Sequence, residues 1–370
     1  MEKNVKENLG VVNQDTIVAT TLELQPEQNG AQYQEQSRLR RYFKPVGVAL
    51  AGLAMLGSSS VPASASEKTS PTTTIEMSGK PLEHAHSSTS TKYEKGPTQT
   101  NPLFAAHPTF AQNFGTYKKG HIDYKYWNVY QGAPPGNSED EFYTNHRANI
   151  RVSGGSLVLD ARQQNINPNY DYTSARVDTA GKEDFLYGKV VVNANMPDGI
   201  GTWPAIWLYP VGNKYEKMSE NIGPDKYLNG GEMDIAEEIG ANPNVVYSTV
   251  HTLGGLLKTN ANGGDPFTKA HRIPGNNHAF NQYSLEWTPS SITMSIDNKV
   301  VMTYDKHPGD TYEQWPFNQR FDLILDLALG GTFGGADKAQ FPPDGIDNAS
   351  LPATMRVQSV YYYPYVGPKK

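Results

Sequence analysis

The sequence contains no cysteine and no excess of basic residues. Its 370 residues include 32 lysines and arginines against 38 aspartates and glutamates, which gives a net charge of −6. The absence of cysteine excludes disulfide scaffolds, thiolate zinc sites, iron–sulfur clusters and cysteine nucleophiles. The acidic balance argues against a nucleic-acid partner, because proteins that bind nucleic acids usually carry a basic surface.

Tyrosine, glycine and proline are abundant, with 22, 34 and 26 residues respectively. Aromatic residues favour strands, whereas glycine and proline favour turns. The composition therefore predicts an all-β protein. The length leaves room for one large domain or two ordinary ones.

The first 65 residues are predicted to be a polar lead followed by a secretory signal. Basic residues between Arg38 and Lys44 precede an apolar run from Val46 to Leu56, and Ala63-Ser64-Ala65 follows it. A basic flank, a short apolar core and an Ala-x-Ala end are typical of such a signal. The run has about 11 residues, fewer than the roughly 20 that a membrane-spanning helix needs. We therefore expect a secreted protein with no stable membrane insertion after cleavage.

Residues 66–100 are predicted to form a linker, and residues 101–370 a single domain. The linker is rich in serine, threonine and proline and has few large apolar residues, so it cannot bury enough surface to offset its ordering entropy. In the domain, Asp297-Asn298 has the composition of a hairpin turn. Strand-type runs cover Ser156–Asp160, Tyr187–Asn195, Ser291–Ile296 and Phe321–Leu329, the last apolar enough for burial on both faces. Many strands with little helical periodicity predict a sandwich or jelly roll.

One segment, Gly231–Ile239, concentrates the acidic residues. In a helix Glu232 and Glu237 would lie about 140° apart around the axis. In a strand Glu232 and Asp234 share one face, and Glu237 is out of phase by one residue. A β-bulge at Ile235-Ala236 would return Glu237 to that face, and bulges are frequent beside active sites.

Three acids in a row on one strand suit the chemistry of a retaining glycosidase. Like charges at this spacing cannot ionise together without cost, so at least one pKa should rise. A retaining enzyme needs one carboxylate as nucleophile and one protonated carboxyl as acid, about 5–5.5 Å apart. Taken alone, the E-x-D-x-x-E pattern is more often a solvated acidic strand edge, so the surrounding segments have to decide.

Three segments together resemble glycoside hydrolase family 16. They are Gly201–Leu208, which reads G-T-W-P-A-I-W-L, the acidic segment, and Val250-His251. Further matching stretches are Tyr172–Arg176, Phe185–Gly188, Tyr283–Thr288, Trp315–Phe317 and Phe321–Gly335, so that the resemblance extends over roughly residues 120–365. Within the family the sequence is most similar to bacterial laminarinases, which are retaining endo-β-1,3-glucanases. The resemblance implies a β-jelly roll of two antiparallel sheets, with the concave sheet forming a sugar-binding cleft.

The resemblance also assigns roles to the acids. It implies that Glu232 is the nucleophile and Glu237 the acid/base. Asp234, between them, would hydrogen-bond the nucleophile and tune its protonation. His251 occupies the position of a cleft histidine beside the catalytic strand.

Substrate binding is predicted from aromatic and polar positions. Trp203 and Trp207 are four residues apart, so they share a face of a strand, and flat rings complement the C–H faces of a sugar. Core packing is the competing interpretation, and the resemblance places both in the cleft together with Arg176 and Asn137. For the remaining tryptophans we expect a structural role; these are Trp127, Trp287 and Trp315.

Four positions depart from the family pattern. Phe333 stands where a tryptophan is usual and brings no N–H donor. Glu141 replaces a glutamine, and Glu238 replaces an aromatic residue and should face away from the cleft. Gln358 stands where many members have an aspartate for a structural calcium, and an amide oxygen can ligate calcium without adding charge. Catalysis is expected to need no cofactor or metal, and structural calcium stays an open, disfavoured alternative.

The sequence thus predicts a secreted, monomeric enzyme that hydrolyses β-1,3-linked glucan with retention. One alternative is the same catalytic apparatus acting on another polysaccharide, such as β-1,3-1,4-glucan, agar or carrageenan, or acting as a transglycosylase. No basic cluster accompanies the acids and tryptophans, which argues against sulfated substrates. Another alternative is a glucan-binding protein without activity, whose signature would be loss of the carboxylates; here all three are present.

Overall fold

The computed structural model describes residues 96–117, 120–167, 169–218, 228–257, 267–274, 279–334 and 345–368. The chain divides into two units, 1–44 and 45–370, and every described residue belongs to the second. The predicted signal and residues 66–95 of the predicted linker lie outside the described residues. Residues 96–100 contact the domain, since the Tyr363 hydroxyl donates to the Pro97 carbonyl at 2.8 Å. Among the described residues no helix is long and apolar enough to span a membrane.

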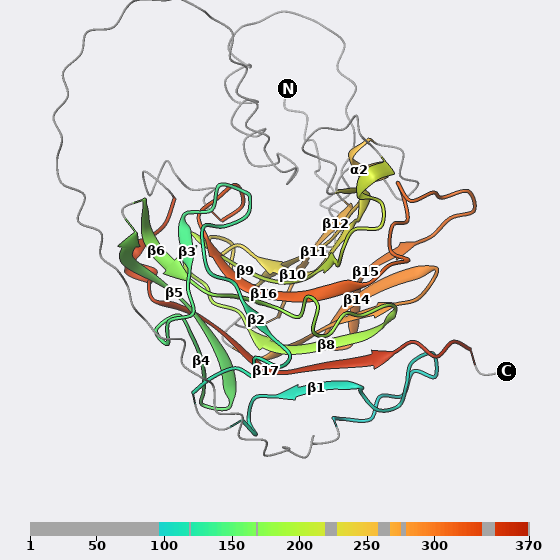
Figure 1. The fold of residues 1–370 in the computed structure, drawn as a ribbon, viewed down its shortest axis with the longest axis horizontal. Helices are drawn as coiled ribbons and strands as arrows, with labels where there is room; N and C mark the ends of the chain where they lie inside the picture. Colours follow the sequence, from blue (N-terminus) through green and yellow to red (C-terminus); the bar gives the residue numbers. More distant parts are fainter. Residues whose placement is uncertain are drawn as a thin grey trace, which may run out of the picture. The chain divides into compact units, whose positions relative to one another are not determined.

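The described strands form two sheets, which Figure 1 shows as stacked layers. In the described residues, ten strands make one sheet, in the order β15-β14-β13-β8-β17-β5-β6-β3 with β1 on β17 and β4 on β5. Their bounds are β1 Phe110–Asn113, β3 Glu141–Tyr143, β4 Ile150–Ser153, β5 Ser156–Asn167, β6 Tyr170–Ser174, β8 Gly188–Asn195, β13 Asn281–Trp287, β14 Ser291–Ile296, β15 Lys299–Asp305 and β17 Ala353–Pro364. All these pairs are antiparallel except β3 with β6.

The second sheet carries the functional face. Within the described ranges it has seven strands in the order β12-β11-β10-β9-β16-β7-β2. Their bounds are β2 Asn128–Val129, β7 Arg176–Asp178, β9 Thr202–Pro210, β10 Glu232–Glu238, β11 Val245–His251, β12 Phe267–Arg272 and β16 Phe321–Leu329. The helical elements that are described are short: η1 Glu216–Met218, α2 Leu253–Leu256 and η3 Asn348–Ser350.

The alternating direction of the side chains along β16 explains how the two sheets pack. Every second residue from Phe321 to Leu329 belongs to the core between the sheets, because side chains alternate between the two faces of a strand. The intervening residues, among them Asp322 and Asp326, point to the other face. All nine residues are buried, which confirms the prediction that this run is buried on both sides.

The predicted all-β sandwich of two mostly antiparallel sheets is confirmed. The four predicted strand runs coincide with β5, β8, β14 and β16. Asp297 and Asn298 join β14 to β15 with φ values of 48° and 64°, the left-handed conformations that a two-residue hairpin turn requires. The tryptophans assigned to a structural role are fully buried, with exposures of 0% for Trp127, 1% for Trp287 and 2% for Trp315.

Candidate active site

The acidic strand β10 contains the predicted bulge. Against β11, Asp234 pairs with Thr249 and Glu237 pairs with Tyr247, so three steps on β10 match two on β11. The extra residue shifts the register between Asp234 and Glu237. Glu237 therefore returns to the face that carries Asp234.

The next residue along β10 points the opposite way. Glu238 is 1% exposed, and the hydroxyl of Tyr283, on β13 of the other sheet, donates to its Oε1 at 3.4 Å. Glu238 thus faces the space between the sheets, as its position after the bulge predicts. Glu232, Asp234 and Glu237 thus face the open side of the sheet, whereas Glu238 faces the core between the sheets.

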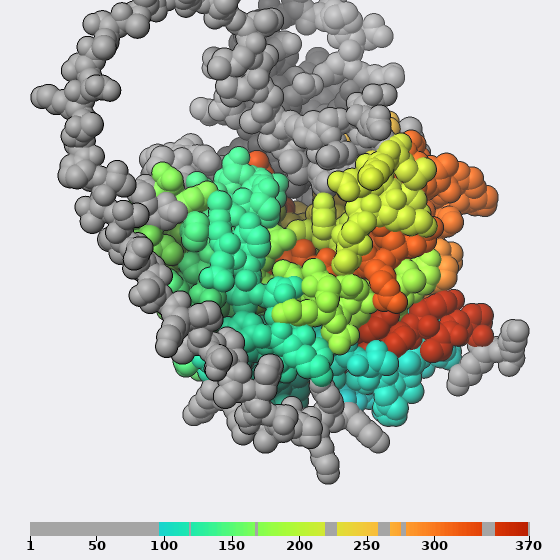
Figure 2. All heavy atoms as spheres, in the orientation of Figure 1, coloured from blue at the N-terminus to red at the C-terminus, as the bar shows by residue number. Residues whose placement is uncertain are grey.

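A cavity of about 420 Å³ lies over the open face of the seven-stranded sheet. In Figure 2 the blue-green atoms around β3 and the yellow atoms around α2 stand on opposite sides of a recess. The cavity is lined by Pro135, Gly136, Asn137, Glu139, Arg176, Trp203, Ala205, Trp207, Tyr209, Glu232, Asp234, Glu237, Asp326 and Ala328. Seven of the nine residues predicted for the site are thereby brought together.

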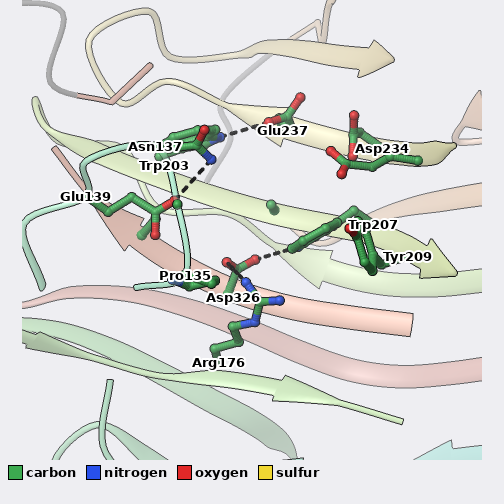
Figure 3. Close-up of a pocket in the computed structure, with 14 residues that line it drawn as sticks. Pro135, Asn137, Glu139, Arg176, Trp203, Trp207, Tyr209, Asp234, Glu237 and Asp326 are labelled. Carbon is green, nitrogen blue, oxygen red and sulfur yellow. Dashed lines mark hydrogen bonds and ion pairs between the residues drawn. The ribbon is translucent and has the colours of Figure 1, made fainter. Parts of the chain in front are cut away.

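Strands and one loop place these side chains (Figure 3). Trp203 and Trp207 come from β9, with Ala205 between them on the same face. Arg176 begins β7, and its guanidinium carbon lies 4.8 Å from the centre of the Trp207 ring. Asn137 precedes β3 and has a φ of 59°, a left-handed conformation that asparagine tolerates.

The other two predicted residues, His251 and Phe333, are not in the cavity lining but support it. His251 Nε2 lies 3.1 Å from Asp234 Oδ2 and 3.9 Å from Glu232 Oε1. The Phe333 ring packs edge-on against Trp203 and against Tyr247, with centres 5.3 Å apart in both pairs. The structure therefore places the histidine beside the acids and the phenylalanine beside a cavity tryptophan.

Burial sets the protonation of the three acids. It raises the pKa of Glu232 to about 8, with the charge of Asp234 adding to the rise and His251 opposing it. Burial likewise raises the pKa of Asp234 to about 8, against a hydrogen bond with Glu232. The pKa of Glu237 is raised well above its usual value by burial and by the charge of Asp234, although the Trp203 indole donates to its Oε1 at 2.9 Å. The strand can therefore hold protons near neutral pH, which general acid catalysis requires.

The sequence matches the model of glycosyl hydrolases family 16 over residues 137–340. The chain belongs to this family. A β-glucanase of Rhodothermus marinus is 36% identical over 238 residues, covering 62% of this chain and 76% of that protein. A glucan endo-1,3-β-glucosidase A1 of Niallia circulans is 30% identical over 246 residues, covering 62% of this chain and 32% of that longer protein. The solved structure of the R. marinus laminarinase superposes with a TM-score of 0.62 at 33% identity, covering 71% of this chain and 98% of that one.

Three polar lining residues of this family 16 site, Glu139, Tyr209 and Asp326, were not predicted from the sequence. Asp326 Oδ1 accepts a hydrogen bond from Trp207 Nε1 at 2.9 Å, and Arg176 Nη1 lies 4.0 Å from its Oδ2. A signal for Asp326 was available: acids recur inside the apolar run of β16, and a buried acid in an apolar strand is more informative than an exposed one. Glu139 belongs to the segment Asn137–Tyr143, which follows a family pattern, whereas Tyr209 carries no comparable local signal.

The side chain at the position of a family calcium ligand brings no carboxylate. Gln358 is neutral, and its Oε1 already accepts a hydrogen bond from Asn193 Nδ2 at 2.9 Å. Calcium sites are built from several oxygen ligands that usually include carboxylates. The Gln358 oxygen, which already accepts a hydrogen bond from Asn193 on β8, is therefore a poor calcium ligand.

Removal of calcium should therefore leave stability unchanged. We expect the melting temperature after dialysis against EDTA to agree with that in calcium within about 1 °C, since a ligand stabilises only when it binds the folded state. Thermal unfolding followed by circular dichroism measures this. A fall of several degrees in melting temperature that added calcium reverses would show that calcium does bind the folded protein.

Proposed function

We propose that this chain is a retaining endo-glycosidase that hydrolyses β-1,3-linked glucan. The observation that carries the proposal is the bulged strand β10, which presents Glu232, Asp234 and Glu237 to one cavity. Two tryptophans in the lining supply flat apolar surfaces for sugar rings. Relatives named as laminarinases and glucan endo-1,3-β-glucosidases support the substrate class.

In the first step the ionised form of Glu232 attacks the anomeric carbon and the protonated form of Glu237 gives its proton to the leaving sugar oxygen. The carbon–oxygen bond to the enzyme forms as the glycosidic bond breaks. The proton of Glu237 is retained before the step because burial and the charge of Asp234 raise its pKa. Trp203 holds the Glu237 carboxyl through its indole N–H.

In the second step water displaces Glu232 from the anomeric carbon and gives a proton to Glu237. The negative charge of Glu232 also raises the pKa of Glu237. This charge disappears when Glu232 becomes an ester, so the pKa of Glu237 falls and it can act as the base. His251 and Asp234 orient Glu232 for its return to the free carboxylate.

We also propose that the protein is exported from the cell. A polymeric substrate does not enter cells, and the sequence has a basic, apolar and Ala-x-Ala order before residue 66. We propose that the domain acts outside the cell as a monomer.

A substrate screen tests the proposal. Laminarin, lichenan, agarose and carrageenan are incubated with the protein, and new reducing ends are measured. We expect laminarin to be degraded into oligosaccharides that appear first as the β-anomer by NMR. Absence of cleavage of laminarin, or first appearance of the α-anomer, would refute the proposed activity; glycosyl transfer to added glucose would reveal transglycosylation.

The substitution Asp234→Asn should narrow the pH range of activity on its alkaline side. It removes a negative charge that raises the pKa of Glu237, so Glu237 should lose its catalytic proton at lower pH. Each pH unit beyond that pKa costs about tenfold in the protonated form. The measurement is the pH profile of kcat/KM on laminarin.

The matched control is Asp297→Asn, an exposed turn residue whose positive φ asparagine tolerates. It should reproduce the wild-type profile. An unchanged alkaline limb in Asp234→Asn would show that Asp234 does not set the proton affinity of Glu237.

A further inference from the structure

A second group of acids lines the cavity away from the catalytic strand. Glu139 and Asp326 lie in the lining, and Figure 3 shows both apart from Glu237 and Asp234. Behind them Tyr143 and Glu141 are 0% exposed on β3. Neither buried residue is needed for the two-step reaction described above.

Only one of the two carboxyl oxygens of Glu141 accepts a hydrogen bond from a described residue. Its Oε2 accepts a hydrogen bond from the Leu329 backbone N–H at 2.8 Å. Its Oε1 is buried and accepts no hydrogen bond from a donor among the described residues. A buried, ionised oxygen without a donor is strongly unfavourable, whereas a protonated carboxyl turns this oxygen into a donor.

One hydroxyl donor is shared between two of the three carboxylates. The Tyr143 hydroxyl lies 3.4 Å from Glu139 Oε2 and 3.3 Å from Asp326 Oδ2, yet it has one proton and can donate to only one of them. Asn137 Nδ2 donates to Glu139 Oε1 at 3.3 Å. One further proton would satisfy both Glu139 and Glu141.

The charges nearby also favour a retained proton. The cation facing this group is Arg176 on β7, whose Nη1 lies 4.0 Å from Asp326 Oδ2. Burial and the charge of Glu139 raise the pKa of Glu141 well above its usual value. Burial raises the pKa of Glu139 to about 7, and a hydrogen bond from Glu141 opposes this rise. The other titratable groups around the pair are Asp140 on the same segment, Tyr172 opposite Glu141 on β6, and Tyr130, whose ring packs on Tyr143.

We propose that Glu141 is a neutral carboxylic acid that donates a hydrogen bond to Glu139, and that this bond holds Glu139 as an ionised acceptor for a sugar hydroxyl in the cleft. Glu141 is thus a positioning residue that acts through Glu139. The role of Glu139 in binding a sugar hydroxyl rests on the proposed function, whereas the protonation of Glu141 does not.

The pH dependence of stability tests the proton with Glu141→Gln. An amide has nearly the same shape and donates to Glu139 without a titratable proton. A group whose folded pKa is raised contributes stability that is complete below its unfolded pKa, near 4.5, and is lost as pH rises towards the folded pKa. We therefore expect equal melting temperatures at pH 4 and a variant that is more stable by roughly 5 °C or more at pH 8.

The matched control is Glu286→Gln on the outer face of β13, where Lys189 Nζ pairs with the carboxylate at 2.9 Å. It should not gain stability relative to the wild type as pH rises. A Glu141→Gln protein that follows the wild type at every pH, or is less stable throughout, would overturn the proposal, because Glu141 would then be ionised in the fold.

Michaelis constants on laminarin test the positioning role. Glu139→Gln should raise KM about tenfold or more, since it weakens a hydrogen bond to a charged acceptor, with a smaller effect on kcat. Glu141→Gln should keep the wild-type KM at pH 8, where Glu139 is ionised, and hold it at higher pH, where the wild-type KM rises. If KM rises in parallel in both proteins, the positioning role is wrong. If laminarin is not a substrate of any protein in the series, the proposed function fails while the stability measurement still decides the proton.

Discussion

Replacing Glu237 by alanine should lower the turnover of laminarin by about 10²- to 10⁴-fold, the range that general acid–base catalysis contributes. Replacing Glu232 by alanine should lower turnover by at least as much, because the carboxylate that forms the covalent intermediate is then missing. Both side chains line the cavity and are half-buried there, so their truncation should leave the fold intact. Initial rates of reducing-end formation measure the loss.

Added azide should separate the two roles. In Glu232→Ala the small anion can occupy the space of the nucleophile and give the α-glycosyl azide. In Glu237→Ala the covalent intermediate still forms from an activated substrate, and azide should open it from the other face to give the β-glycosyl azide.

The identity of the azide product is decisive because it reports the face of attack. Retention of near-normal turnover by either variant would exclude that residue from the reaction. The same azide anomer from both variants would exclude the assignment of nucleophile and acid/base. Glu286→Gln, a surface change on the opposite sheet, should behave like the wild type.

Leu325→Ala should be among the most destabilising single substitutions. Leu325 is 0% exposed in β16 and lies between Ile206 of β9 and Val177 of β7. Truncation of a buried leucine removes apolar contacts and leaves a cavity, which costs about 2–5 kcal/mol of unfolding free energy. For a domain of this size the melting temperature should fall by roughly 5–15 °C.

Urea or thermal unfolding by circular dichroism measures the effect of Leu325→Ala. Val300→Ala is the control, because Val300 is 63% exposed on β15 and surface substitutions usually change stability by less than about 0.5 kcal/mol. Equal effects of the two substitutions would contradict tight packing between the sheets at β16.

Features encoded in short segments could be predicted from the sequence. The two-residue alternation of strands placed Glu232 and Asp234 on one face, and the extra residue before Glu237 required the bulge that the register shows. The same periodicity gave the burial of Phe321–Leu329. These predictions concern residues within one strand, and the backbone geometry of a strand alone determines which face each side chain points to.

Contacts between distant segments were decided only by the tertiary structure. Glu139 approaches Asp326 through Tyr143 although 187 residues separate them, and His251 reaches Asp234 because β11 pairs beside β10. Phe333, predicted to contact substrate, packs edge-on against Trp203 outside the cavity lining. The missing cysteines excluded cysteine chemistries and the small acidic net charge argued against a nucleic-acid partner, and the acidic segment together with the family segments around it predicted the reaction. Which acids keep protons depends on burial and on charges brought together by strand order, and these are properties of the assembled sheets.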